Sequence, residues 1–170
     1  IILSTPLNLI DTYSNKYSSY VYVKREDLQV TRSFKIRGSF NKISSLSEKE
    51  KQNGIVCSSA GNHAQGVSMS CNKLKIKGII FMPNTTPSIK VLKVREFGGE
   101  FITIKLVGDS YDDCYKEAIG YCNKNKKTFI HPFDDEKVIA GQGSLAYEIF
   151  KELSDTIDYL FIPIGGGGLV

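Results

Sequence analysis

The sequence predicts an α/β fold in which an open, mainly parallel sheet carries helices on both faces. Short, apolar, β-branched runs alternate along the chain with longer segments of helical periodicity. Glycine, proline or a capping residue stands at several of the boundaries between them. The chain has 170 residues, of which 41% are hydrophobic and 24% charged, enough to bury the core of one domain or of two small ones.

Six segments are expected to be buried strands, because each is short, apolar and bounded by turn residues. They are residues 20–23, 54–58, 77–82, 100–104, 128–130 and 159–164. Five helices are expected, at residues 34–46, 63–73, 88–97, 110–123 and 138–153. Such alternation is typical of parallel sheets, which bind ligands at the carboxyl ends of their strands.

Local signals mark some of these boundaries. Ser47 and Glu50 have the spacing of a capping box and predict a short helical turn. Gly98 and Gly99 follow the third helix, where a C-terminal glycine is expected.

Charge and cysteine content narrow the class of protein. The net charge is +4, but the lysines are dispersed, which indicates a solvated surface and not the basic stripe of a nucleic-acid binder. No apolar run approaches the roughly 20 residues that span a bilayer. The four cysteines form no CxxC pair and only two histidines are present, so no metal site is expected. Reduced thiols of this kind suit the cytoplasm.

The ends of the chain suggest a fragment. It begins at Ile1 without a methionine, and it stops at Val170, directly after a glycine run that should open a helix. We therefore expect part of the fold to lie outside this sequence.

Lys35 is the first candidate for chemistry, in the motif Ser-Phe-Lys-Ile-Arg-Gly at residues 33–38. A lysine at a helix start is usually a solvated surface residue, and the helix dipole disfavours a cation there. The placement makes sense if the amine is bonded to an aldehyde cofactor instead of remaining a free cation.

A second candidate is the loop around Asn62, at residues 57–66. Small residues at a strand-to-helix turn let backbone N–H groups approach an anion, and an asparagine amide suits a phenolic oxygen. The alternative is a capped turn with Ser59 or Asn62 as the N-cap. His63 alone is more typical of a structural histidine at a helix start than of a catalytic base.

The third candidate is the glycine loop, which we define as Gly165, Gly166, Gly167 and Gly168. Glycine loses more backbone entropy on folding than any other residue, so four in a row need a compensating gain. Close backbone approach to a phosphate would provide one. A flexible linker, the alternative, more often mixes glycine with serine. The run matches neither the dinucleotide fingerprint nor the P-loop.

In this order, the three motifs resemble the fold-type II pyridoxal-phosphate enzymes (tryptophan synthase β-like), and among them the biosynthetic threonine dehydratases, or threonine ammonia-lyases. The similar segments are SFKIRG, SSAGNHAQG, IKVLKVREFGGE, VIAGQGSLAYEI and IPIGGGGL. The resemblance implies two open, twisted, mainly parallel sheets with flanking helices. Residues 1–56 would begin the large subdomain, 57–146 would form the small one, and 147–170 would return to the large one, which is incomplete here.

The resemblance also implies site residues. Lys35 would be the catalytic residue and would carry pyridoxal phosphate covalently. The other cofactor-binding residues would be Phe34 against the ring, Asn62 at its 3′ oxygen, and Gly165, Gly166, Gly167, Gly168 and Leu169 around the phosphate. The substrate carboxylate would be bound by Ser59, Gly61, Asn62 and His63.

The implied reaction is the dehydration and deamination of L-threonine, and also of L-serine, which yields 2-oxobutanoate from threonine as the first step of isoleucine biosynthesis. The implied protein is a cytoplasmic homo-oligomer, a tetramer, with no nucleic-acid or membrane partner. One alternative is a serine racemase or serine dehydratase of the same fold. Ala60 and Phe133 stand where serine racemases tend to have a hydroxyl residue and an asparagine. A non-enzymatic phosphate-binding module would explain the glycines but not Lys35.

Overall fold

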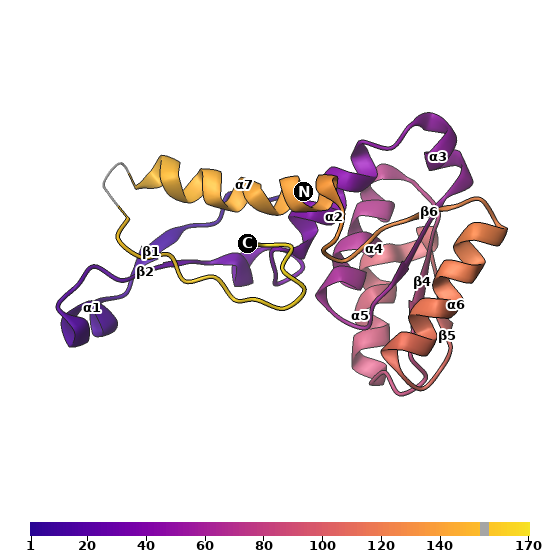
Figure 1. Ribbon diagram of the computed structural model, residues 1–170, viewed down its shortest axis with the longest axis horizontal. Helices are drawn as coiled ribbons and strands as arrows, with labels where there is room; N and C mark the ends of the chain where they lie inside the picture. Colours follow the sequence, from indigo (N-terminus) through magenta and orange to yellow (C-terminus); the bar gives the residue numbers. More distant parts are fainter. Residues whose placement is uncertain (154–156) are drawn as a thin grey trace.

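The computed structural model describes residues 1–153 and 157–170. It contains a parallel four-stranded sheet in the order β5-β4-β3-β6, on the right in Figure 1. The strands are β3 (Ile55–Ser58), β4 (Gly78–Met82), β5 (Ile102–Leu106) and β6 (Thr128–Phe129). All four were predicted. β5 begins two residues later than expected, because the 3-10 turn η2 (Gly99–Phe101) precedes it.

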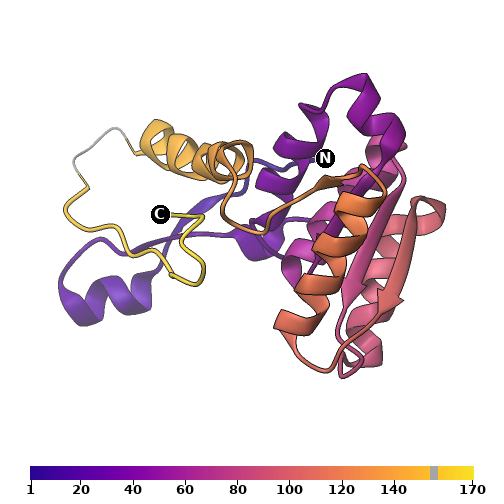
Figure 2. The same ribbon diagram turned by 45° about the vertical axis from the view of Figure 1, so that its right-hand side comes forward.

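Helices cover both faces of this sheet, as the sequence predicts. α4 (Asn62–Leu74) and α5 (Ser88–Gly98) cover one face, and α6 (Tyr111–Lys124) covers the other. α2 (Lys35–Ser44) packs on α4, and the short α3 (Glu48–Asn53) precedes β3. Successive strand residues point to opposite faces. Thus Ile55 and Cys57 join the apolar cluster with α4 and α5, whereas Val56 joins Cys114 and Ala118 of α6 on the other face (Figure 2).

Two predicted boundary signals are confirmed. At α3, the backbone N–H of Ser47 donates to Glu50 Oε2 at 2.8 Å, and the Glu50 N–H donates to Ser47 Oγ at 3.4 Å. At the end of α5, Gly99 has a φ of +53°, a left-handed conformation that favours glycine.

A second region extends away from the sheet (Figure 1). It contains β1 (Leu7–Leu9), α1 (Asp11–Tyr17), β2 (Tyr22–Lys24), the 3-10 turn η1 (Glu26–Leu28) and α7 (Glu136–Glu152). β1 and β2 pair antiparallel, and α7 runs along this hairpin. The sequence predicted β2, two residues early, and α7, but it did not predict β1 or α1.

The prediction of a buried strand at residues 159–164 is wrong. Among the described residues no strand pairs with this segment, and Tyr159 and Phe161 are 82% and 91% exposed. An apolar run becomes a buried strand only where neighbouring strands satisfy its backbone. Within the described part of the chain, no helix is long and apolar enough to cross a membrane.

Candidate active site

Lys35 lies at the start of α2, with Phe34 as the N-cap. Its Nζ donates a hydrogen bond to the carbonyl oxygen of Pro132 at 2.7 Å and lies 5.4 Å from the centre of the Phe34 ring. The side chain is half-buried, and burial lowers the pKa of the amine. A lowered pKa favours the uncharged amine, which is the form that attacks an aldehyde.

Lys35 and the glycine loop face the same cavity, although they are far apart in the sequence. The C-terminal segment runs back toward the start of α2 (Figure 1). The cavity has a volume of about 250 Å³ and is lined by Phe34, Lys35, Pro163, Ile164, the four glycines and Leu169. The structure therefore brings Lys35, Phe34 and the glycine loop together around one cavity.

The glycine loop can present its backbone to an anion. A Cβ added at Gly165 or Gly167 would meet no atom within 4 Å, and Gly167 has a φ of +85°, where a side chain is strained. Exposed backbone of this kind, beside a desolvated amine, fits a cofactor that carries both an aldehyde and a phosphate.

The asparagine loop follows β3 at the carboxyl end of the sheet. α4 begins at Asn62 with Gly61 as its N-cap, and no side chain caps the helix. The expectation of Ser59 or Asn62 as the N-cap is thus wrong: the Ser59 hydroxyl instead accepts the Gly61 N–H at 3.2 Å. Since no side chain occupies them, the first-turn N–H groups of α4 remain available to an anion such as a carboxylate.

This loop lies next to Lys35 because α2 and α4 approach closely. A Cβ added at Gly66, one turn after Asn62, would lie 3.1 Å from the carbonyl oxygen of Lys35. The helix that begins at the asparagine loop thus packs against the backbone of Lys35, but Ser59, Gly61, Asn62 and His63 do not line the cavity. The Asn62 side chain itself is exposed.

His63 has a structural side chain. It is buried, and its Nε2 lies 3.0 Å from the carbonyl oxygen of Ile130, so this nitrogen carries the proton and donates it. Burial, with a smaller contribution from the nearby charge of Lys35, lowers the pKa of the imidazole to about 4. His63 is therefore neutral at pH 7, and only its backbone N–H is free to bind a substrate.

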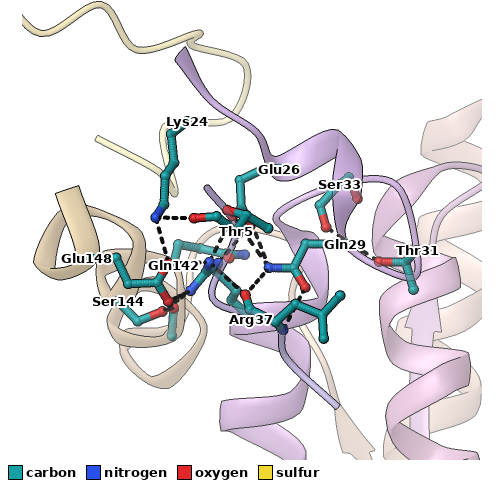
Figure 3. Close-up of polar contacts among 12 residues, drawn as sticks. Thr5, Lys24, Glu26, Gln29, Thr31, Ser33, Arg37, Gln142, Ser144 and Glu148 are labelled. Atoms are coloured by element: carbon teal, nitrogen blue, oxygen red, sulfur yellow. Dashed lines mark hydrogen bonds and ion pairs between the residues drawn. The ribbon is translucent and has the colours of Figure 1, made fainter. Parts of the chain in front are cut away.

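A buried charge network surrounds Arg37, two residues after Lys35 on α2 (Figure 3). The guanidinium of Arg37 donates to Glu26 at 2.8 Å and to Glu148 at 2.7 Å. Burial lowers the pKa of Arg37, but the hydrogen bonds to both carboxylates outweigh this and raise it overall. Lys24 adds a contact of 3.0 Å to Glu148. The network joins α2 to η1, β2 and α7.

Sequence reasoning missed three contributors to the site. These are the Pro132 carbonyl, the Phe133 ring beside the glycine loop and the Arg37 network. In the sequence, Phe133 is distinctive only because serine racemases tend to have an asparagine there, and this does not predict contact with the glycine loop. No sequence signal identified the carboxylates that would meet Arg37.

Comparisons with known sequences agree with this geometry. The family model described as pyridoxal-phosphate dependent enzyme matches residues 1–170. The chain is 55% identical over 170 residues to "L-threonine dehydratase biosynthetic IlvA" of Halalkalibacterium halodurans and 52% identical to that of Bacillus subtilis. All of the chain is covered in both alignments, but it spans only 41% and 40% of these curated relatives.

Solved structures show the same fold. The processed form of threonine deaminase isoform 2 from Solanum lycopersicum has a TM-score of 0.94 and 42% identity, over 99% of this chain and 46% of that one. Maize serine racemase has a TM-score of 0.92 and 28% identity, over 99% of this chain and 50% of that one. The two scores are similar, so the fold alone does not separate deaminase from racemase. By its sequence, its fold and its paired lysine and glycine loop, the chain belongs to the family of pyridoxal-phosphate-dependent enzymes.

Proposed function

We propose that the full-length protein is a pyridoxal-phosphate-dependent lyase that dehydrates and deaminates L-threonine, and also L-serine. Threonine would give 2-oxobutanoate and ammonia, the first step of isoleucine biosynthesis. The observation that carries the proposal is Lys35, half-buried with a lowered pKa, at a cavity whose other wall is the glycine loop. The relatives with 55% and 52% identity, which bear the name threonine dehydratase, support the choice of substrate.

Each predicted residue has a task in this reaction. When bound, pyridoxal phosphate supplies an electron sink for the charge left by removal of the α-proton. Lys35 Nζ would hold the cofactor covalently and, as a free amine, would accept that proton. The backbone of the glycine loop, with Leu169, holds the phosphate, and Phe34 packs against the ring.

The asparagine loop orients the substrate. Asn62 is exposed at the first residue of α4, and its amide would bond the cofactor's phenolic oxygen. The Ser59 hydroxyl and the backbone N–H groups of Asn62 and His63 would bind the carboxylate, and the Gly61 N–H, which donates to Ser59 Oγ, would orient that hydroxyl. For His63 this task falls to the backbone, because its side chain donates to Ile130.

Ala60 favours dehydration over racemisation. Racemisation needs a second proton donor, within about 3 Å of the α-carbon on the face opposite Lys35. Ala60 has only a methyl group, and it packs against the apolar cluster between the sheet and α4. We therefore expect the β-hydroxyl to leave before the α-carbon is reprotonated on the wrong face.

The test is turnover of L-threonine by the full-length enzyme, with 2-oxobutanoate and the remaining amino acid both quantified, the latter by chiral chromatography. Lys35→Ala should abolish 2-oxobutanoate formation, whereas the control Lys42→Ala, on the same helix, should retain it. Sustained turnover by Lys35→Ala, or substantial D-allo-threonine from the unmodified enzyme, would contradict the proposal.

The proposal includes a cytoplasmic homo-oligomer, a tetramer, without nucleic-acid or membrane partners. All four cysteines are free and buried, which suits a reducing compartment. Exposed aromatic side chains gather on α1 and β2, where Tyr13, Tyr17 and Tyr22 are 51%, 59% and 40% exposed. Such patches are typical of surfaces that other protein segments cover. Light scattering of the full-length protein checks the mass of the assembly.

A further inference from the structure

Phe133 does not line the cavity itself but packs against the glycine loop that does, next to the residue that contacts Lys35. The carbonyl oxygen of the preceding residue, Pro132, accepts the hydrogen bond from Lys35 Nζ at 2.7 Å. On its other side, the Phe133 ring faces the glycine loop. The segment 131–133 therefore contacts both the lysine and the phosphate-binding backbone.

This segment is anchored to the sheet. The Ile130 N–H donates to the carbonyl oxygen of Val56 at 2.8 Å, and the Ile130 carbonyl accepts from His63. The His131 ring packs edge-on against Phe133, with 4.7 Å between ring centres. His131 Nδ1 also accepts the Asp134 N–H at 2.7 Å, which closes the turn around Phe133. The orientation of the Phe133 ring is thus fixed from the sheet side.

The four glycines differ in what surrounds them. A Cβ at Gly166 would overlap the Phe133 ring and lie 2.6 Å from its Cε1. A Cβ at Gly168 would lie 2.7 Å from Phe133 Cβ and 2.8 Å from its Cα and carbonyl oxygen. Real Cβ atoms essentially never come within 3.0 Å of such neighbours. At Gly165 and Gly167, by contrast, a Cβ would meet nothing within 4 Å.

We propose that Phe133 is a positioning residue that fixes the glycine loop at its working distance from Lys35. Gly166 and Gly168 are glycine because they pack against Phe133, whereas Gly165 and Gly167 present backbone to the cofactor phosphate. The inference rests on the cofactor of the proposed function but not on the identity of the amino-acid substrate. It also explains why the run alternates between crowded and open positions.

The test is a double-mutant cycle on the full-length protein, with pyridoxal phosphate titrated and its binding followed by visible absorbance. Gly166→Ala should raise the Kd for the cofactor at least tenfold. Adding Phe133→Ala removes the ring atoms that the new methyl group meets, so the double variant should bind better than Gly166→Ala and no worse than Phe133→Ala alone.

Gly168→Ala is the matched control. Its methyl group would meet the backbone of Phe133, which an alanine keeps, so Phe133→Ala should not restore its affinity. The proposal is overturned if Phe133→Ala fails to rescue Gly166→Ala, or if it rescues Gly168→Ala equally well. The titration contains no amino-acid substrate, so it tests the role of Phe133 alone. If the unmodified enzyme bound the cofactor but did not turn over threonine, that result would contradict the proposed function and leave this inference intact.

If Gly166→Ala fails to fold, single variants of Phe133 test the same proposal through their affinity for the cofactor. Phe133→Ala should raise the Kd for pyridoxal phosphate several-fold, and Phe133→Leu, which retains an apolar wedge, should recover much of it. The melting temperature of the cofactor-free protein should change little, since Phe133 belongs to neither apolar cluster of the sheet. An unchanged Kd in Phe133→Ala would refute the positioning role.

Discussion

The sheet region and the extended hairpin region are held together by different interactions. Around the sheet, two clusters of buried apolar side chains pack on its opposite faces. Along the hairpin, the main buried link is ionic, with Arg37 between Glu26 and Glu148 (Figure 3). α2 carries both Lys35 and Arg37 and packs on α4 and α7, so it belongs to both regions. The position of the reactive amine therefore depends on both.

This difference predicts different responses to mutation. Apolar packing is spread over many weak contacts, so stability falls in proportion to the atoms removed. A buried ionic network responds abruptly, because removal of one partner leaves the other charges desolvated and unpaired.

The largest effect is expected for Arg37→Met. The change leaves Glu26 buried without a cation and Glu148 with Lys24 as its only cation, and loss of one partner of a buried pair costs about 3–5 kcal/mol. Urea denaturation of the full-length protein measures the free energy of unfolding. Arg25→Met is the control, since the Arg25–Asp27 pair is exposed and should contribute little. Equal losses in the two variants would show that the Arg37 network is not a structural link.

Ile80 tests the apolar region. Its side chain is fully buried in the cluster between β4 and the α4–α5 face. Ile80→Ala should cost about 2–5 kcal/mol and Ile80→Val about 0.5–1.5 kcal/mol, because packing is lost in proportion to volume. Thermal and urea unfolding of both variants check this. Similar losses for the two substitutions would mean that this face is not closely packed.

The smallest of these effects is a pH dependence carried by Glu148. Its burial raises the pKa of the carboxyl, but hydrogen bonds to Arg37 and Lys24 outweigh this and lower it below the ordinary value of 4.5. A folded-state pKa below the unfolded one stabilises the protein above about pH 4.5, and the contribution is lost as pH falls through the lowered pKa. Glu148→Gln should make the free energy of unfolding less dependent on pH between 5 and about 3. An identical pH profile for the variant would rule out this contribution.

The sheet could be predicted from the sequence because its signals are local. β3, β4 and α4 to α7 each carry their own apolar periodicity, and Ser47 and Gly99 mark ends by their own chemistry. β1 could not be predicted, since three residues define it only through pairing with β2. Residues 159–164 have the composition of a strand, but in the described chain they have no neighbour to pair with.

Some residues of the candidate site could likewise be predicted from local motifs, and others could not. Lys35, Asn62 and the glycine loop lie in motifs that resemble a known family, and the structure brings the lysine and the glycine loop to one cavity. Pro132 contributes its backbone carbonyl oxygen, which every residue type has, so the sequence could not identify it. Arg37 has partners both earlier and later in the chain, and no local pattern specifies such long-range ion pairs.

The most direct test of this account is to locate the cofactor on the chain. The full-length protein, loaded with pyridoxal phosphate, would be reduced with borohydride, digested and analysed by mass spectrometry. Because Lys35 is the amine that lines the glycine-loop cavity, we expect the visible absorbance band to disappear and the cofactor's mass to remain on the peptide containing Lys35. Cofactor found instead on Lys24, which is paired with Glu148, or on Lys42, which is paired with Asp135, would contradict the account.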